Sequence, residues 1–348
     1  MSEQKVLRHR VQLRPNLTIA DVQELAAEPG LRILQTASPL DGETWELINE
    51  ELLARRPEVE IRVYGFYSLI CDLSFLSHLK NLRRFSADCL HKASGIEHLA
   101  GLEKLETLSV GIYALENFDF LRMIPAGLRE LALAKTKSKK PRLDEVGRFR
   151  SLQRLYLEGQ QRGIEVLSSL ASLERLTLRS ISTNDLGYLQ RLDRIWSLEV
   201  KLGGINDFSA LEGKECLKYL ELWQIRGLRD LSFISSLSGL QYVFLQALRN
   251  VIAIPDLSRL VKLRRLSLEN MRALVDVSAL WSSRSLTEFT HVSANNMQPE
   301  QYEDLDKIST LERVLVGFGS KKRNQEFEAM MRRAGKERFK GGKFVFKQ

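Results

Sequence analysis

The sequence predicts an α/β solenoid, in which short parallel strands line one side of the chain and short helical turns return along the other. Three observations support this prediction. A pattern written L-x-x-L-x-L recurs every 21 to 25 residues through most of the chain. A motif written D-x-S, followed by apolar residues, stands between several of these units. Apolar residues make up 44% of the 348 residues, enough for the continuous core that stacked repeats require.

The leucine pattern defines the strands. A weaker unit opens the series in the stretch EVEIRV, where Ile61 and Val63 take the fourth and sixth positions. Side chains alternate along a strand, so positions four and six point into the core and positions three, five and seven point to the other face. In the other eleven units the first position falls on Leu82, Leu105, Leu128, Leu152, Leu173, Ile195, Leu217, Leu240, Leu263, Leu286 and Leu311.

The return segments are predicted to be helical turns. An Asp or Ser oxygen can accept one of the backbone N–H groups that the first turn of a helix leaves unpaired. We place these turns on the convex side. The motif occurs as DLSFL at 72–76, DFSAL at 207–211, DLSFI at 230–234, DLSRL at 256–260 and DVSAL at 276–280.

Together the two motifs resemble the bacterial internalin-like class of leucine-rich repeats, over about residues 58–316. The resemblance implies a curved parallel sheet on the concave face and short helical turns on the convex face. It also implies roles such as adaptor, neutraliser of a toxin or host-directed effector, and the sequence does not choose among them.

One departure from the family lies at the ninth repeat position, where its members usually carry Asn. Without a ladder of Asn side chains, we expect the turns to satisfy their backbone groups in another way. The position reads Leu90, Tyr113, Thr136, Gln160, Ile181, Gly203, Ile225, Leu248, Met271, Ala294 and Gly319.

The two ends are predicted to be caps. Residues 1–57 form a helical N-terminal cap, with helices in ADVQELAAE and TWELINEELLARR and a strand at LRILQ between them. Residues 58–316 form the solenoid of about 11 to 12 repeats. Residues 317–348 form a basic C-terminal cap, in which NQEFEAMMRRAG is a helix ending near Gly335 and KFVFK resembles a strand. We expect Phe339, Phe344 and Phe346 to close the core there.

Charge and cysteine content bound the setting. The net charge is +8, and residues 321–348 alone contribute ten Lys or Arg against three Glu, so the rest is nearly neutral. Three widely spaced cysteines suggest free thiols in a reducing compartment. The charged N-terminus argues against a signal peptide, and no run of 18 apolar residues predicts a membrane span. We expect a cytoplasmic protein, with export without a cleavable signal left open.

Aromatic residues gather at the outward positions of two adjacent strands. Tyr219, Trp223, Tyr242 and Phe244 lie there with charged residues around them, which is typical of a protein-binding hot spot. Two alternatives are cross-strand pairs that only stabilise the sheet, or a self-contact in a dimer. The predicted partner-binding residues are Tyr156, Arg175, Arg179, Glu199, Tyr219, Glu221, Trp223, Tyr242, Phe244, Arg265 and Glu269.

Motifs of catalysis are missing from the sequence: it has no glycine-rich phosphate loop, G-x-S-x-G or H-E-x-x-H. We predict no catalytic residue, cofactor, metal site or small-molecule substrate, and interpret inward-facing His291 as a core histidine. The expected function is non-enzymatic binding of a folded protein through the concave face. The alternative is binding of nucleic acid or an anionic surface through the basic C-terminal segment.

The loop Lys135–Arg142 is expected to be solvated, or else to contact an acidic partner or nucleic acid.

Overall fold

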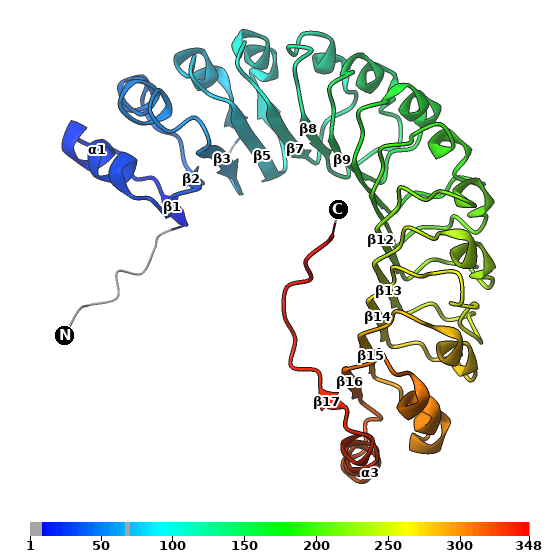
Figure 1. The fold of residues 1–348 in the computed structure, drawn as a ribbon. Coiled ribbons are helices and arrows are strands. Elements are labelled where there is room, and N and C mark those ends of the chain that lie inside the picture. The colour runs from blue at the N-terminus through cyan, green and yellow to red at the C-terminus, as the bar shows by residue number, and fades with distance from the viewer. Residues whose placement is uncertain (1–8, 67–69, 348) are drawn as a thin grey trace, which may run out of the picture. The chain divides into compact units, whose positions relative to one another are not determined.

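The structure is a computed structural model that describes residues 9–66 and 70–347. Contacts divide the chain into two compact units, Met1–Leu173 and Glu174–Gln348. Within each unit, strands lie along one side and short helical turns along the other (Figure 1). The predicted α/β solenoid with a parallel sheet is therefore confirmed.

The first unit contains a parallel sheet whose strands follow one another in chain order. A small separate sheet pairs β4 (Cys71–Asp72) with β6 (Ala93–Ser94). The strands of the main sheet are β1 (Arg10–Gln12), β2 (Ile33–Thr36), β3 (Glu60–Tyr64), β5 (Arg84–Leu90), β7 (Thr107–Ile112), β8 (Glu130–Leu133) and β9 (Arg154–Glu158). The helices are α1 (Ile19–Ala27), α2 (Gly42–Leu47), a π-helix (Ile48–Leu53) and 3-10 helices at Ser74–His78, Ile96–Gly101, Asp119–Arg122, Asp144–Arg148 and Ile164–Ser169.

The second unit repeats this design. Its parallel strands are β10 (Arg175–Arg179), β11 (Ser197–Lys201), β12 (Tyr219–Trp223), β13 (Tyr242–Gln246), β14 (Arg265–Glu269), β15 (Glu288–Val292), β16 (Arg313–Val316) and β17 (Glu337–Arg338). Its helices are 3-10 helices at Gly187–Leu189, Ser209–Leu211, Ser232–Ser236, Ser278–Ser282 and Pro299–Lys307, followed by α3 (Lys321–Arg333).

Neighbouring repeats of the second unit stack without a shift of register. Tyr219 pairs with Tyr242, and Tyr242 pairs with Arg265, each at the third position of its repeat. The inward residues of β12, Leu220 and Leu222, are fully buried, and a buried Leu contributes roughly 1.5–3 kcal/mol to folding. We call the opposite side of the sheet, to which positions three, five and seven point, the strand face.

The D-x-S segments begin the return turns as predicted. In all five, the backbone N–H of the Ser donates to Oδ1 of the Asp two residues earlier, at 2.8 to 3.2 Å. Four of the segments form 3-10 helices, and the one at 256–260 forms a plain turn. These hydrogen bonds from Ser hold the pKa values of the Asp carboxyl groups below their usual range.

Backbone hydrogen bonds take the place of the Asn ladder in the second unit. The residue at repeat position eight adopts a left-handed conformation, as Leu202 does at φ 56°. Its N–H then reaches the carbonyl of the next strand, so that Leu202 donates to Trp223 at 2.9 Å. The same arrangement recurs at Ser180, Gln224, Ala247 and Asn270. Position nine can therefore be apolar and buried, as at Ile181, Ile225, Leu248 and Met271.

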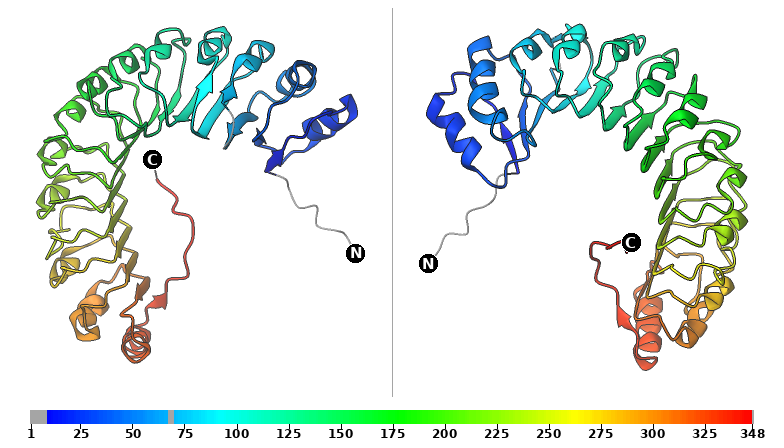
Figure 2. Two further views of the ribbon diagram at one scale, coloured as in Figure 1. Left: turned by 180° about the vertical axis from the view of Figure 1, so that it is seen from behind. Right: turned by 45° about the horizontal axis from the view of Figure 1, so that its top comes forward.

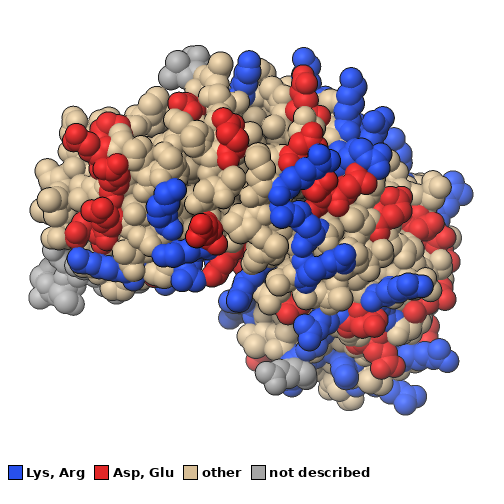
Figure 3. Space-filling view, turned by 90° about the horizontal axis from the view of Figure 1, so that it is seen from above, with Lys and Arg blue, Asp and Glu red and all other residues tan. Residues whose placement is uncertain are grey.

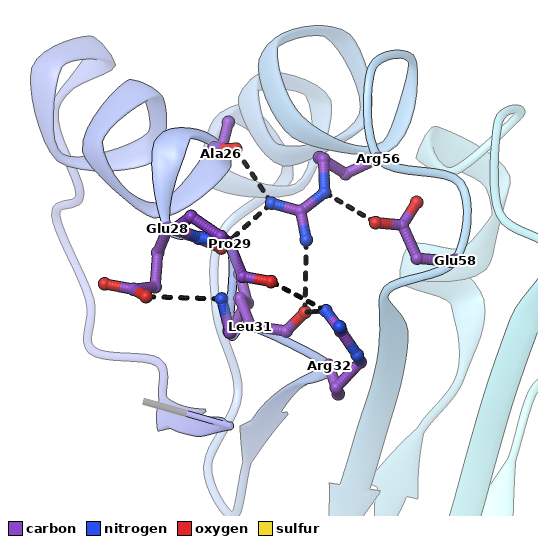
Figure 4. Close-up of polar contacts among 8 residues, drawn as sticks. Ala26, Glu28, Pro29, Leu31, Arg32, Arg56 and Glu58 are labelled. Carbon is purple, nitrogen blue, oxygen red and sulfur yellow. Dashed lines mark hydrogen bonds and ion pairs between the residues drawn. The ribbon is translucent and has the colours of Figure 1, made fainter. Parts of the chain in front are cut away.

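An arginine ties the first helix to the repeat that follows it. Arg56 donates to the carbonyls of Ala26, Glu28 and Leu31 at 2.9 to 3.2 Å, and its Nε pairs with Glu58 at 2.6 Å (Figure 4). Ala26 lies in the last turn of α1, and Glu28 and Leu31 follow that helix. Carbonyl groups at the C-terminal end of a helix have no hydrogen-bond partner within the helix. The helices and the strand predicted for residues 1–57 are present, and β2 pairs in parallel with β3.

The C-terminal end differs from the prediction. The predicted helix is present as α3, and Gly335 follows it at φ 72°. However, the strand-like segment KFVFK forms no strand, and β17 lies earlier in the chain. The prediction that Phe339, Phe344 and Phe346 close the core is also wrong, since all three are only half-buried. The core here is closed by the fully buried rings of Tyr302, Phe318 and Phe327.

The segment 339–347, which we call the tail, instead returns along the strand face of the second unit (Figures 1 and 2).

All three cysteines are free thiols, with Cys71 buried and Cys89 exposed. Among the described residues, none of the helices combines the length and apolar character needed to cross a bilayer.

Candidate functional site

The predicted partner-binding residues all lie on strands of the parallel sheet. Ten of them lie on β10 to β14 of the second unit, at positions three, five or seven of their repeats. Tyr156 lies on β9 of the first unit, where its hydroxyl donates to Glu158 at 3.1 Å. Three of the residues in the second unit, Tyr219, Tyr242 and Arg265, contact the tail.

The tail contacts a row of side chains at positions two and three of four successive repeats. We call this set the tail-contact row: Trp196, Lys218, Tyr219, Gln241, Tyr242, Arg264 and Arg265.

Tilted and edge-on contacts between aromatic rings form the apolar part of this contact. Phe344 lies 5.2 Å from Tyr242, and Phe346 lies 5.3 Å from Trp196, measured between ring centroids. Phe346 also meets Tyr219 edge-on at 6.0 Å. Tyr219 and Tyr242 are 5.1 Å apart, so the cross-strand pair considered as an alternative is present. Such aromatic pairs contribute about 0.5–1.5 kcal/mol each beyond the area they bury.

Hydrogen bonds hold the main chain of the tail. The amide of Gln241 engages Lys347 twice: it accepts from the backbone N–H at 2.7 Å and donates to the carbonyl at 2.8 Å. Arg264 donates to the carbonyl of Val345 at 2.6 Å, and Arg265 donates to that of Gly342 at 3.1 Å. These contacts do not depend on the side chains of the tail.

The same two arginines also lie over aromatic rings. The guanidinium carbon of Arg264 is 4.5 Å from the centroid of Phe344. That of Arg265 is 5.3 Å from Tyr242, 5.1 Å from Phe344 and 5.0 Å from Phe339. A cation over a ring face contributes about 0.5–2 kcal/mol, more when water is excluded. The row therefore combines ring faces with cations.

Arg265 is also part of a buried ion network. Its Nε pairs with Glu288, and Glu288 pairs in turn with Arg313 on the next strand. Arg265 is 7% exposed and Glu288 is 5% exposed, although both point to the strand face. The packing of the tail across Arg265 accounts for part of this burial.

A second set of residues, at positions five and seven, forms the central patch: Glu199, Lys201, Glu221, Trp223, Phe244 and Glu269. Lys201 pairs with Glu199 at 2.6 Å and with Glu221 at 3.1 Å. Burial by itself would lower the pKa of Lys201, but the hydrogen bonds and charges of the two carboxylates outweigh it and raise that pKa. Glu221 also accepts a hydrogen bond from the Tyr219 hydroxyl at 2.8 Å. Burial, and then Glu221, raise the pKa of Tyr219.

The aromatic members of the central patch are partly accessible. Trp223 and Phe244 are each half-buried, on neighbouring strands. The Arg179 guanidinium lies 5.6 Å from the Trp223 ring. Among the residues that the structure describes, none gather as three or more metal-ligating side chains. The central patch therefore presents aromatic rings and ion-paired side chains, which are groups suited to non-covalent binding.

Sequence reasoning missed position two and the tail. The rows at positions three, five and seven exclude Lys218, Gln241 and Arg264, which supply most of the hydrogen bonds to the tail. They also exclude Trp196, which supplies a ring contact. The available signal was the alternation Phe344-x-Phe346, which suits an extended segment with one apolar side.

Comparison with known proteins supports the fold. No protein-family model matches the sequence, and no curated protein matches it either. Among solved structures, an internalin from Listeria monocytogenes is similar with a TM-score of 0.57 at 20% identity, over 88% of this chain and 90% of that one. A leucine-rich repeat protein from Leptospira interrogans is similar with a TM-score of 0.51 at 14% identity, over 94% and 100%.

A third similar structure is the TLR13–ssRNA13 complex, with a TM-score of 0.50 at 15% identity, over 88% of this chain and 54% of that one. At these identities, the likeness concerns the fold alone. Together with the register of the repeats and the turns that join them, it shows that this chain has a leucine-rich repeat solenoid fold similar to that of the internalin.

Proposed function

We propose that the chain is a non-enzymatic binding module whose strand face, in the second unit, contacts a folded protein partner. Adaptor, toxin-neutralising and effector roles all fit such a module. The observation that carries the proposal is the central patch, in which Trp223 and Phe244 stand accessible beside the ion-paired side chains of Lys201 and Glu221. Accessible aromatic rings bordered by paired charges are typical of interface hot spots.

The rigidity of the sheet supports this proposal. Each ring is fixed on a strand whose neighbours pair with it in parallel, residue for residue. Strands spaced about 4.8 Å apart present such rings in rows suited to the surface of a protein rather than to a small molecule. Since the strands that carry the rings are paired with their neighbours, little backbone entropy is lost when a partner binds.

Removing both rings of the central patch tests the proposal. We expect Trp223→Ala with Phe244→Ala to weaken binding of the partner by at least about 100-fold, because each such anchor contributes about 2 kcal/mol. Partners are identified by quantitative mass spectrometry of captured proteins and then purified, and their affinity is measured by calorimetry. The matched control is Val292→Ala, which removes an outward apolar side chain, 41% exposed, from β15. Equal binding by the double variant and the control would refute the proposal.

The second candidate function is binding of nucleic acid or an anionic surface by the basic C-terminal segment. Exposed Lys321, Lys322, Lys340 and Lys343 support it. Against it, the rings of Phe344 and Phe346 are engaged by the tail-contact row, and basic and acidic side chains intermingle on the face in Figure 3. Retention on an oligonucleotide would fall steeply with salt, because it depends on counterion release. Binding of a protein partner through Trp223 and Phe244 would persist at high salt concentration.

A further inference from the structure

We propose that the tail-contact row is a recognition site for an extended peptide with two aromatic residues separated by one, and that the tail occupies it as a tethered competitor. A segment of this kind in a partner protein would displace residues 339–347. The inference deepens the proposed function and rests on it, because the tail covers Tyr219 and Tyr242 on the same strand face that is proposed to bind the partner.

The conformation of the tail defines the aromatic spacing. Phe344 and Phe346 both face the row and are half-buried, whereas Val345 between them is 70% exposed. This alternation is that of an extended chain, in which successive side chains point to opposite sides. A ligand must therefore place its rings at positions i and i+2, and the residue between them can vary.

The polar contacts determine how the tail-contact row binds the main chain of the peptide. The Gln241 amide matches the N–H and the carbonyl of a single residue, Lys347, as a neighbouring strand would. Arg264 donates a hydrogen bond to the carbonyl of Val345, and its guanidinium carbon lies 4.5 Å from the centroid of the Phe344 ring. One side chain thus joins the ring to the main chain next to it, which favours an aromatic residue over an aliphatic one at this position.

The charges show that the tail is an imperfect occupant. The row carries Lys218, Arg264 and Arg265, while the tail brings two further cations, Lys343 and Lys347, to the same place. Of the cations in the row, Arg265 is compensated by buried Glu288. The side chains of Lys343 and Lys347 are exposed, on the same side of the extended tail as Val345, so this repulsion acts over a distance. A partner segment with acidic residues at these two places would remove it.

Tethering compensates for the imperfect fit. Only a few residues separate β17 from Phe344, so the tail stays near the row at an effective concentration on the order of millimolar. An external peptide must compete with it, and binds more weakly to the intact chain than to a chain whose tail has lost its rings. A better-matched segment overcomes this competition.

The test uses full-length chains and a fluorescein-labelled peptide of residues 340–348, with fluorescence anisotropy as the readout. We expect Phe344→Ala with Phe346→Ala in the chain to bind this peptide at least tenfold more tightly than the wild type does. Phe346→Ala alone should give a smaller gain, which keeps the test valid if the double variant folds poorly. The matched control is Val345→Ala, which changes the exposed residue between the two rings and should behave as the wild type.

The specificity of the row is tested on the double variant. The peptide carrying Lys343→Glu and Lys347→Glu should bind about fivefold more tightly than the native peptide, as two surface charge pairs allow. The peptide carrying Phe344→Ala and Phe346→Ala should not bind. Adding Gln241→Ala to the double variant should weaken binding of the native peptide about tenfold, because the peptide then loses both hydrogen bonds that Gln241 makes to its main chain.

Each result decides the proposal. Equal affinity of the wild type and the double variant would show that the tail does not compete, and absence of binding to both would remove the peptide site. An affinity that changes with protein concentration, with a dimer seen by light scattering, would place the tail in a second copy and overturn the tethered arrangement. Peptide binding that follows these expectations, alongside partner binding that ignores Trp223 and Phe244, would retain the peptide site and refute only the proposed function.

Discussion

Replacing Glu288 by alanine is expected to lower the free energy of unfolding by about 3 kcal/mol, the cost of removing one partner from a buried ion pair. Glu288 is 5% exposed and pairs with Arg265 on one side and Arg313 on the other. Without it, the guanidinium of Arg265 stays buried beneath the tail with no carboxylate to compensate its charge. Equilibrium urea denaturation at neutral pH measures the loss.

Two further variants distinguish the effect of losing the ion pair from the effect of any substitution in this part of the chain. Glu312→Ala, on an exposed neighbouring side chain, should change the free energy of unfolding by less than about 0.5 kcal/mol. Arg265→Met combined with Glu288→Leu should recover part of the loss, because apolar side chains of similar volume often replace a buried ion pair without cost. If Glu288→Ala unfolds like the Glu312 control, the buried network does not have the stabilising role that its geometry indicates.

The stability of the chain is expected to fall between pH 7 and pH 5 through one buried histidine. His291 is fully buried at an inward strand position, where its Nδ1 atom and the hydroxyl of Tyr302 form a hydrogen bond of 2.7 Å. Burial lowers the pKa of His291 from 6.5 to about 4. The unfolded chain therefore takes up a proton on this residue at a higher pH than the folded chain does. The stability that neutral His291 contributes is complete above pH 6.5 and is lost as the pH falls towards 4.

The size of the effect follows from the shift. At 1.36 kcal/mol per pKa unit, the wild type should lose about 2 kcal/mol more between pH 7 and pH 5 than a variant without this group. The variant is His291→Leu with Tyr302→Phe, which leaves no buried hydroxyl unpaired and restores the leucine that the repeat expects. Carboxylates titrate in both proteins, so their contribution cancels in the difference. Parallel loss in wild type and variant would show that His291 is not buried as a neutral group.

The strands and turns were predictable because each depends on nearby residues. A strand needs only leucines at fixed spacing, and inward residues such as Leu220 and Leu222 are fully buried as the pattern required. The D-x-S turns depend on hydrogen bonds between residues two apart, such as Asp72 and Ser74. Such local contacts recur from one repeat to another, and the sequence motifs recur with them.

The position of the tail was not predictable because its contacts are distant in sequence and do not recur. Lys347 meets Gln241 across 106 residues and Lys218 across 129. Apolar residues such as Phe344 and Phe346 suit a terminal core as well as a surface row, and composition cannot distinguish the two. Once Phe318 and Phe327 have filled the core at this end, the later rings have to pack elsewhere.

The outward direction of the aromatic residues was predictable, but their state was not. Alternation along β12 and β13 places Tyr219 and Tyr242 on the strand face. Whether these rings meet a partner, each other or the chain itself depends on the tail. In the structure they meet each other and the tail, and all four aromatic residues, including Trp223 and Phe244, are half-buried.

Photo-crosslinking from position 346 tests most directly the claim that the tail lies on the strand face. With p-benzoylphenylalanine in place of Phe346, mass spectrometry should find intramolecular crosslinks to the segments that contain Trp196 and Tyr219. The same probe in place of exposed Val345 should give few or none there. Crosslinks from position 346 to α3, to the return turns or to a second chain, with none to those two segments, would contradict the account.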